Sequence, residues 1–362
     1  MTYKETLFFI GKCLTITHEN HNKILVEDDI KSGNIDWDAV VKVSTGHFVF
    51  PALYCNLRRA NFLHYLPQDL VLYMKHITDL NRERNQEIIE QAKEINELLL
   101  VNNITPIFLK GTGNLLEGLY EDIGERMVGD IDILVSNHDF QKAIAILKKD
   151  GYATDKLKYM TFHWHYPRIV KEKKICALEV HNKVLKKPYT KFLSYDTLII
   201  KYLEIGNYKI ASYNNQLLIN ILPKQINDNL YFSKTISLRT IYDYYLLSEK
   251  NEAIIDRKIT KKIDKQINNF LSCASLVLNQ PNTIKYTSNK SSDNYLKSYH
   301  LLLENSKREK RIVDLLNYYV KIKDRFEVIK YSFLDKEYRS FTLRKMGELD
   351  FYKKRLGIKP NS

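Results

Sequence analysis

The chain has 362 residues, of which 44% are hydrophobic and 27% charged, and it carries a net charge of +13 at pH 7. This composition indicates a soluble globular protein with room for one large domain or two ordinary ones. No run of 18 or more apolar residues occurs, and the N-terminal segment lacks a small-residue cleavage site. We therefore expect a cytoplasmic protein without a membrane span.

The positive charge has two explanations that the sequence leaves open. Lysine and arginine attract anionic partners, but Lys, Ile, Asn and Tyr are abundant together, which is typical of an AT-rich genome. The four cysteines are far apart, which argues against a disulfide framework or a cysteine zinc site and favours buried free thiols. They are Cys13, Cys55, Cys176 and Cys273.

The elements expected in the first part of the chain are helical. Residues 1–80 contain short helical patterns, such as 48–57 and 70–77, separated by polar turns, and predict a small helical layer. Asn81–Asn102 has an apolar stripe opposite Glu and Lys residues and predicts a stronger amphipathic helix.

A strand, helix, strand, helix unit is expected next. Thr105–Leu109 predicts a buried strand, followed by a turn over Lys110–Gly113 and a helix over Asn114–Tyr120. Ile131–Val135 predicts a second strand, followed by a helix that begins after Ser136 or Asn137 and stops at Gly151.

Two alternating runs, Tyr159–Val170 and Lys174–Val184, predict a β-hairpin around a charged turn. Beyond Tyr195 the pattern is helical to the end, with a polar linker over Gln280–Asp293. We therefore divide the chain into an N-terminal helical region (1–80), a core (81–195) and a C-terminal helical domain (196–362).

Asp130 and Asp132 are the first candidates for chemistry. Side chains alternate along a strand, so both carboxylates project to one face while Ile131, Ile133 and Val135 enter the core. Adjacent carboxylates repel each other and are stable when a hard cation such as Mg²⁺ lies between them. Alone, this two-carboxylate motif is weak evidence, because it is common in surface turns.

Glu179 is the candidate third carboxylate. Cys176, Leu178 and Val180 face one way along the predicted strand, so Glu179 and His181 face the other. A charge within an apolar strand is costly unless it is paired or metal-bound. The alternative is that Glu179 lies on the solvent face of an edge strand.

Lys110, Gly111 and Thr112 follow a strand and precede a helix, where backbone N–H groups and a lysine can meet phosphates. The alternative is an ordinary glycine turn, and the sequence lacks the GKS or GKT of a P-loop.

These pieces occur in a definite order, and further residues accompany them. The accompanying residues are Arg84-Asn85, Pro106 to Gly111, Tyr120, Arg126, Gly129 to Val135, Ala143, Leu147, Gly151-Tyr152, His165, Leu178 to His181 and, more loosely, Leu238-Arg239 and Asp243. In this order they resemble the uncharacterised nucleotidyltransferase family of the DNA polymerase beta superfamily. Two positions depart from the pattern: KGTG replaces a Gly-Gly or Gly-Ser signature, and Asn182 stands where tryptophan is usual.

The resemblance implies an α+β fold, a polymerase-beta-type core with a mixed sheet flanked by helices. It also implies two Mg²⁺ ions and transfer of a nucleoside monophosphate from an NTP such as ATP to an acceptor, with release of pyrophosphate. Asp130, Asp132 and Glu179 would hold the metals, and Glu179 could also act as general base. Lys110, Gly111, Thr112, Arg126 and His181 would contact the nucleotide.

Two alternatives concern individual site residues. Arg126 could neutralise phosphate charge or pair structurally with Asp130. His163 and His165 share a face and, with His181, could form a zinc triad, although hydrogen-bonded histidines beside carboxylates are the commoner arrangement.

The acceptor is not readable from the sequence; a small molecule, a peptide or a protein is favoured over a nucleic acid. One alternative function is a toxin-type enzyme that modifies tRNA, which the positive charge permits. Another is a non-catalytic module of the same fold that binds nucleotide or RNA, against which the three intact carboxylates argue.

Overall fold

The structure, a computed structural model, describes residues 1–154, 163–250, 261–304 and 306–346. Its centre is a five-stranded mixed sheet with strand order β3-β2-β1-β5-β4. β1 pairs antiparallel with β2 and parallel with β5, while β2 and β3 are parallel and β4 and β5 antiparallel. The strands are β1 (Ile107–Leu109), β2 (Asp130–Leu134), β3 (Ala177–His181), β4 (Tyr202–Ile205) and β5 (Tyr208–Ala211).

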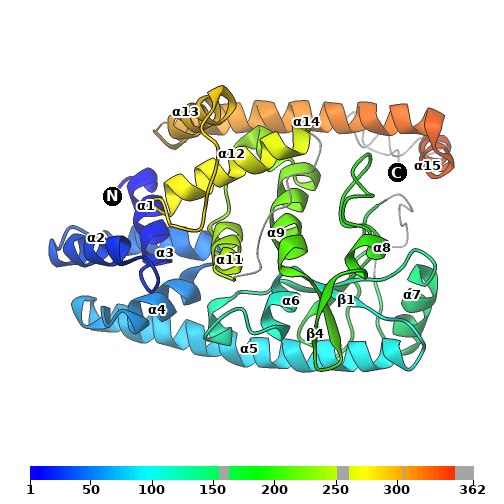
Figure 1. Cartoon of the computed structure of the whole chain (residues 1–362), viewed down its shortest axis with the longest axis horizontal. Helices are drawn as coiled ribbons and strands as arrows, with labels where there is room; N and C mark the ends of the chain where they lie inside the picture. The colour runs from blue at the N-terminus through cyan, green and yellow to red at the C-terminus, as the bar shows by residue number, and fades with distance from the viewer. Residues whose placement is uncertain (155–162, 251–260, 305, 347–362) are drawn as a thin grey trace, which may run out of the picture.

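Helices flank this sheet, as the α+β prediction requires. α5 runs along one side of the molecule and α14 along the opposite side, with the sheet and α9 between them (Figure 1). The first helices are α1 (Tyr3–Cys13), α2 (Asn20–Lys31), α3 (Trp37–Gly46), α4 (Phe50–Arg59), η1 (Leu63–Tyr65), α5 (Gln68–Leu100), α6 (Lys110–Leu116), η2 (Ile123–Glu125) and α7 (Phe140–Lys149). The later ones are α8 (Tyr195–Leu198), α9 (Tyr213–Leu222), η3 (Pro223–Asn227), α10 (Leu230–Ser233), α11 (Leu238–Ser248), α12 (Lys261–Val277), α13 (Lys290–Glu304), α14 (Ser306–Leu334) and α15 (Lys336–Met346).

Helix α5 corrects the prediction of two separate helices around residue 80. The apolar stripe is interrupted there, but Thr78, Asn81 and Asn85 continue the buried face. Their polar groups bond backbone carbonyls, so the helix stays intact without apolar side chains at these positions. The predicted domain boundary at residue 80 thus falls inside a helix, and the division into three parts stays a prediction.

Around the first strands, two predicted helix starts were wrong. α6 begins at Lys110, directly after β1, because Lys110 itself turns the chain with a left-handed φ of 52°. α7 begins at Phe140, later than expected, because Ser136 accepts a hydrogen bond from the backbone N–H of Asp139 in a turn before the helix. The predicted stop at Gly151 is confirmed by its φ of 97°.

The predicted hairpin before Val184 is present only in part. Residues 155–162 lie outside the described residues, and the rest of its first run forms isolated antiparallel bridges, His165 with His181 and Ile169 with Leu178. β3 makes its continuous pairing with β2 instead.

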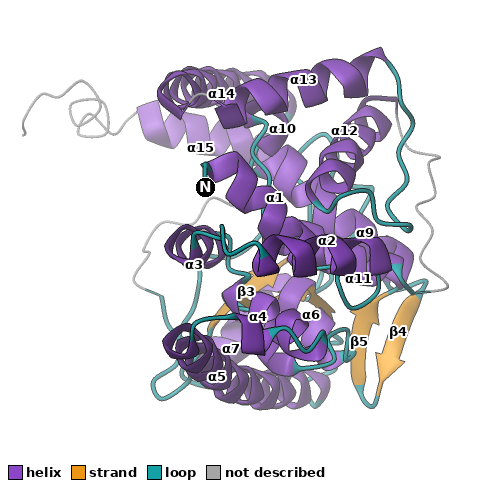
Figure 2. Cartoon of the chain, turned by 90° about the vertical axis from the view of Figure 1, so that its left-hand side faces the viewer, coloured by secondary structure: helices purple, strands orange, loops and turns teal. Residues whose placement is uncertain are grey.

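The prediction that the chain is helical beyond Tyr195 was wrong for residues 202–211 and is confirmed by helices α9 to α15 in the described residues that follow. β4 and β5 form a hairpin across Gly206, whose φ is 61°, at one edge of the sheet (Figure 2). Each strand has four residues, too few for an alternation pattern to be distinct. Because β5 pairs with β1, this segment belongs to the central sheet.

Two further findings bear on the sequence predictions. All four cysteines are free and buried, as expected. No helix among the described residues is long and apolar enough to cross a membrane.

Helix α5 also supports the loop that leads into β2. Asn85 donates to the carbonyls of Ile123 and Arg126, and Arg84 Nη1 donates to the carbonyl of Val128 at 2.5 Å. The loop therefore approaches β2 along a fixed path. This gives Arg84 and Asn85 a structural role as anchors.

Asp122 fastens the same loop to α4 and α5. Its carboxylate accepts hydrogen bonds from Arg58, from Arg82 and from the backbone N–H of Gly124. Burial alone would raise the pKa of Asp122, but these donors outweigh it and lower the pKa to about 2. The ionised form is therefore the one that the fold stabilises.

Changing Asp122 to Asn should lower the free energy of unfolding by about 1–2 kcal/mol at pH 7. The folded pKa lies below the ordinary value of 3.8, so this contribution is complete above pH 5 and is lost as the pH falls from 4 toward 2. Urea unfolding of both proteins at several pH values tests this. Asp79→Asn, which removes a more exposed partner of Arg82, should cost less than about 0.5 kcal/mol. A pH-independent difference for Asp122 would contradict the assignment.

Gly11 marks a close contact between α1 and α12. A Cβ at this position would lie 2.0 Å from the carbonyl oxygen of Val277, whereas one at Gly46 in α3 would meet nothing within 4 Å. We expect Gly11→Ala to destabilise the protein by about 2–3 kcal/mol, because one backbone must move. Gly46→Ala should be neutral or slightly stabilising. Equal unfolding midpoints in urea for the two variants would show that the helices do not pack as described.

Candidate functional site

A cavity of about 330 Å³ lies between the sheet and helices α6, α9 and α11. Most of the residues predicted from the sequence line it: Lys110, Gly111, Arg126, Asp130, Asp132, Glu179 and His181. Thr112 is the exception. It is fully buried, and its hydroxyl donates to the backbone carbonyl of Asp130 at 3.2 Å, so it supports the strand.

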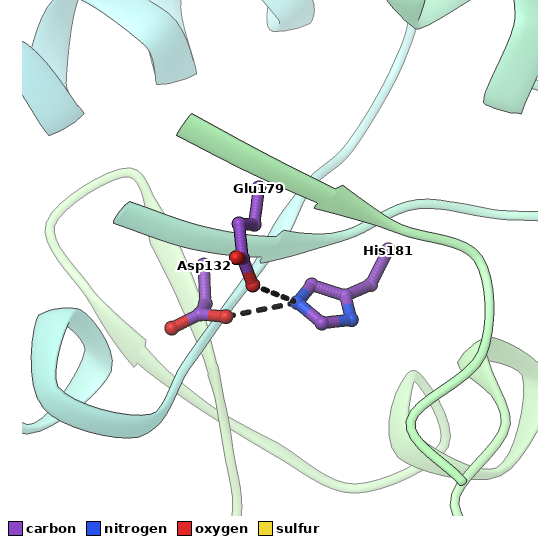
Figure 3. Close-up of side chains that lie close together, drawn as sticks. All are labelled: Asp132, Glu179 and His181. Carbon is purple, nitrogen blue, oxygen red and sulfur yellow. Dashed lines mark hydrogen bonds and ion pairs between the residues drawn. The ribbon is translucent and has the colours of Figure 1, made fainter. Parts of the chain in front are cut away.

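Asp132 and Glu179 are brought together by the pairing of β2 with β3. The two residues are direct partners in the parallel register, so their side chains lie next to each other on one face of the sheet. His181, two residues further along β3, shares this face, and its Nε2 lies 2.8 Å from Asp132 Oδ1 and 3.6 Å from a Glu179 oxygen (Figure 3). One ligand atom from each residue lies within 4.8 Å of the others.

Lys110 supplies the positive charge next to Asp132. Its Nζ lies 2.5 Å from Asp132 Oδ1, and Asp132 is 7% exposed. Burial alone would raise the pKa of Asp132, but Lys110 and His181 outweigh it and hold the pKa well below its ordinary value. The pKa of Glu179 is also lowered despite burial, chiefly by the neighbouring Nε2 of His181 at 3.6 Å. Both carboxylates are therefore anionic at neutral pH.

Asp130 is held by Arg168, which the sequence analysis did not select. The guanidinium of Arg168 pairs with Asp130 and, at 3.3 Å, with Glu179, so one cation bridges two carboxylates. Burial raises the pKa of Asp130, and Arg168 opposes this rise. The sequence did hold a signal, because side chains alternate along the predicted run Tyr159–Val170 and Arg168 therefore faces away from Ile169. The bridge of Ile169 to Leu178 places Arg168 on the face that Glu179 occupies.

Arg126 does not pair with Asp130, so that alternative was wrong. Its guanidinium makes a bidentate contact with Asp243 of α11, at 2.9 to 3.0 Å, and Tyr120 donates to the same carboxylate at 2.7 Å. Arg126 and Asp243 are 8% and 3% exposed. Arg126 therefore lines the cavity with its charge already compensated.

The three histidines lie in series beside the carboxylates. Ring centroids are 4.5 Å apart for His163 and His165, and 5.1 Å apart for His165 and His181. Burial lowers the pKa of His163 to about 4 and also lowers that of His165. Across the described part of the chain, however, the residues whose ligand atoms converge are Asp132, Glu179 and His181, so a three-histidine zinc site is not formed.

The donor atoms at this site fit a hard divalent cation. Carboxylate oxygens predominate, and these are the ligands that Mg²⁺ prefers, whereas zinc sites favour nitrogen and sulfur. In the structure, the ammonium of Lys110 and the guanidinium of Arg168 neutralise the three carboxylates only in part, because two positive charges face three negative ones. The cluster thus needs positive charge.

Comparison with known proteins agrees with this geometry. No curated protein and no solved structure matches the chain significantly. The model of a protein family described as uncharacterised nucleotidyltransferases matches residues 33–279, which is more than half of the chain and includes the sheet and the cavity. The mixed sheet and the acidic cluster fit a role in nucleotidyl transfer, and the chain belongs to this uncharacterised nucleotidyltransferase family.

Proposed function

We propose that this protein is a Mg²⁺-dependent enzyme of the cytoplasm that transfers a nucleoside monophosphate from an NTP to an acceptor and releases pyrophosphate. The observation that carries the proposal is the pairing of Asp132 with Glu179 across β2 and β3, with Asp130 on the same strand and all three facing one cavity. Three carboxylates gathered in this way suit the binding of metal ions that bridge nucleotide phosphates.

In this proposal, Asp130, Asp132 and Glu179 would hold two Mg²⁺ ions, with Asp130 and Asp132 as ligands of one and all three carboxylates as ligands of the other. Bound Mg²⁺ would neutralise phosphate charge and make an acceptor hydroxyl more acidic. His181 donates from Nε2 to Asp132 and orients that carboxylate. His181 thereby supports the metal ligand and borders the nucleotide site.

The acceptor oxygen would attack the α-phosphorus in line with the leaving group. A new oxygen–phosphorus bond forms, the bond from the α-phosphorus to the bridging oxygen breaks, and pyrophosphate leaves with that oxygen. We propose that a Glu179 carboxylate oxygen accepts the acceptor's proton, since this carboxylate is ionised at neutral pH and borders the cavity.

Lys110, Gly111 and Arg126 are proposed to contact the phosphates. Lys110 would offer its ammonium, which lies beside Asp132, and Gly111 leaves room for Arg126, since a Cβ there would lie 3.2 Å from Arg126 Nη2. Thr112 contributes indirectly through Asp130. The acceptor is a small molecule, a peptide or a protein in the favoured proposal, and a tRNA in the alternative.

Changing Asp132 to Asn should reduce nucleotidyl transfer by at least about 100-fold, because loss of an outer-shell partner alone costs roughly 10–100-fold. The assay incubates the protein with each α-labelled NTP, Mg²⁺ and a cell extract, and measures label in macromolecules and small molecules. Asp150→Asn is the matched control, since Asp150 pairs with Lys171 outside the cavity. Thermal melting checks folding, and wild-type labelling by Asp132→Asn would remove this residue from the site.

Metal removal and RNase treatment separate the remaining possibilities. Chelation by EDTA should abolish the label, and Mg²⁺ should restore it, because the carboxylates depend on bound cations to engage phosphates.

If the label persists after RNase treatment of the extract, the acceptor is not RNA; if it disappears, the acceptor is an RNA such as tRNA. No labelling with any NTP, metal or extract would favour the non-catalytic binding module.

A further inference from the structure

Arg239, on helix α11, is a cation that lines the cavity without a carboxylate of its own. Its Nη1 donates to the backbone carbonyl of Met127 at 3.0 Å, and its guanidinium lies 4.9 Å from the ring centre of Phe48. Within residues 1–154, 163–250, 261–304 and 306–346, no carboxylate oxygen lies within 4.0 Å of its nitrogens. One face and one nitrogen are engaged, and the remaining N–H groups are available to a ligand.

The nearest arginine, Arg126, has already taken the local carboxylate. Asp243 makes its bidentate contact with Arg126 and also accepts the Tyr120 hydroxyl, which leaves no direct contact for Arg239. This wall of the cavity therefore carries two guanidinium groups and one carboxylate, which contacts Arg126 and not Arg239. The surplus is one positive charge.

That surplus charge is costly in the absence of an anion. Burial, together with the like charge of Arg126, lowers the pKa of Arg239 to about 10, so the group is still protonated at neutral pH. A desolvated cation is compensated in folded proteins by a paired anion. Within the described part of the chain, Arg239 lacks this anion, and an anionic ligand would supply it.

One backbone contact and one ring contact hold the guanidinium of Arg239 in place. Phe48, between α3 and α4, has a left-handed φ of 58°, which places its half-exposed ring against Arg239. The carbonyl of Met127 accepts a hydrogen bond from Nη1 of the same guanidinium. With Nη1 bound to a carbonyl and the ring beside it, the guanidinium keeps further N–H groups in the fixed fork geometry that matches phosphate oxygens.

Arg239 lines the same cavity as Gly111 and Arg126, which are proposed to contact the phosphates. Gly111, at the start of α6, lies against Arg126, and Arg126 and Arg239 are close enough to repel each other electrostatically. Arg239 also interacts favourably with Asp130 across the cavity. A polyanion bound between α6 and the carboxylates would thus extend toward Arg239.

We propose that Arg239 binds the triphosphate of the NTP and, after transfer, the pyrophosphate that leaves. This inference rests on the proposed function. Arg239 contributes through a charge-assisted fork on non-bridging phosphate oxygens, and Phe48 from the N-terminal helices acts as its positioning residue. The site therefore uses a surplus cation from α11 in addition to Lys110.

The test measures binding separately from turnover. Isothermal titration calorimetry of the full-length protein with inorganic tripolyphosphate, in the presence of Mg²⁺, requires neither a known acceptor nor a known nucleobase. We expect Arg239→Gln to weaken tripolyphosphate binding by at least about tenfold and Arg239→Lys to weaken it less, since lysine keeps the charge but loses the fork.

Arg58→Gln is the matched control. Arg58 also contacts an aromatic ring, that of Tyr54 at 5.6 Å, but it pairs with Asp122 outside the cavity. Its tripolyphosphate affinity should stay within about twofold of wild type. Thermal melts of every variant identify loss of folding, and Arg239→Lys carries the test if Arg239→Gln does not fold.

The outcomes are distinct. Weaker tripolyphosphate binding by folded Arg239 variants, with Arg58→Gln unchanged, supports the inference even if the labelling assay finds no transfer, in which case only the enzymatic proposal fails. Wild-type affinity in the Arg239 variants overturns the inference even if transfer is observed. Absence of tripolyphosphate binding by the wild-type protein also overturns it.

Discussion

The site depends on the parallel pairing of β2 with β3, because the register places Asp132 beside Glu179. Two anions at this distance would destabilise the sheet if they stood alone. Lys110, His181 and Arg168 offset the repulsion, each from a different segment of the chain. The fold therefore keeps the carboxylates ionised and adjacent, which is the state that a metal ion requires.

The loop before β2 has to be fixed for this register to matter. Asn85 of α5 holds it from one side through backbone carbonyls, and Asp122 ties it to the arginines of α4 and α5. On the other side, Arg126 is pinned by Asp243 of α11. Polar side chains of three helices, α4, α5 and α11, thus hold this loop in place, and β2 enters the sheet in one register.

The family resemblance predicted the α+β fold, and strict alternation along the strands predicted that Asp130 and Asp132 share one face and that Glu179 and His181 share one face of their own strand. The sequence analysis did not predict which cations pair with the carboxylates on those faces. Arg168 lies 38 residues from Asp130, and Arg126 lies 117 residues from Asp243. Periodicity is a local property and carries no information about such pairings. The hairpin β4–β5 was missed because its strands are too short.

The position of Phe48 against Arg239 shows that the cavity is composite along the chain. Its surroundings draw on the N-terminal helices, the strands of the sheet and α11, and one helix, α5, joins the first two without a break. A piece of the protein that began at residue 81 would divide α5 and remove Phe48. The residues that surround the cavity are thus not confined to a contiguous segment of about a hundred residues around the acidic motif.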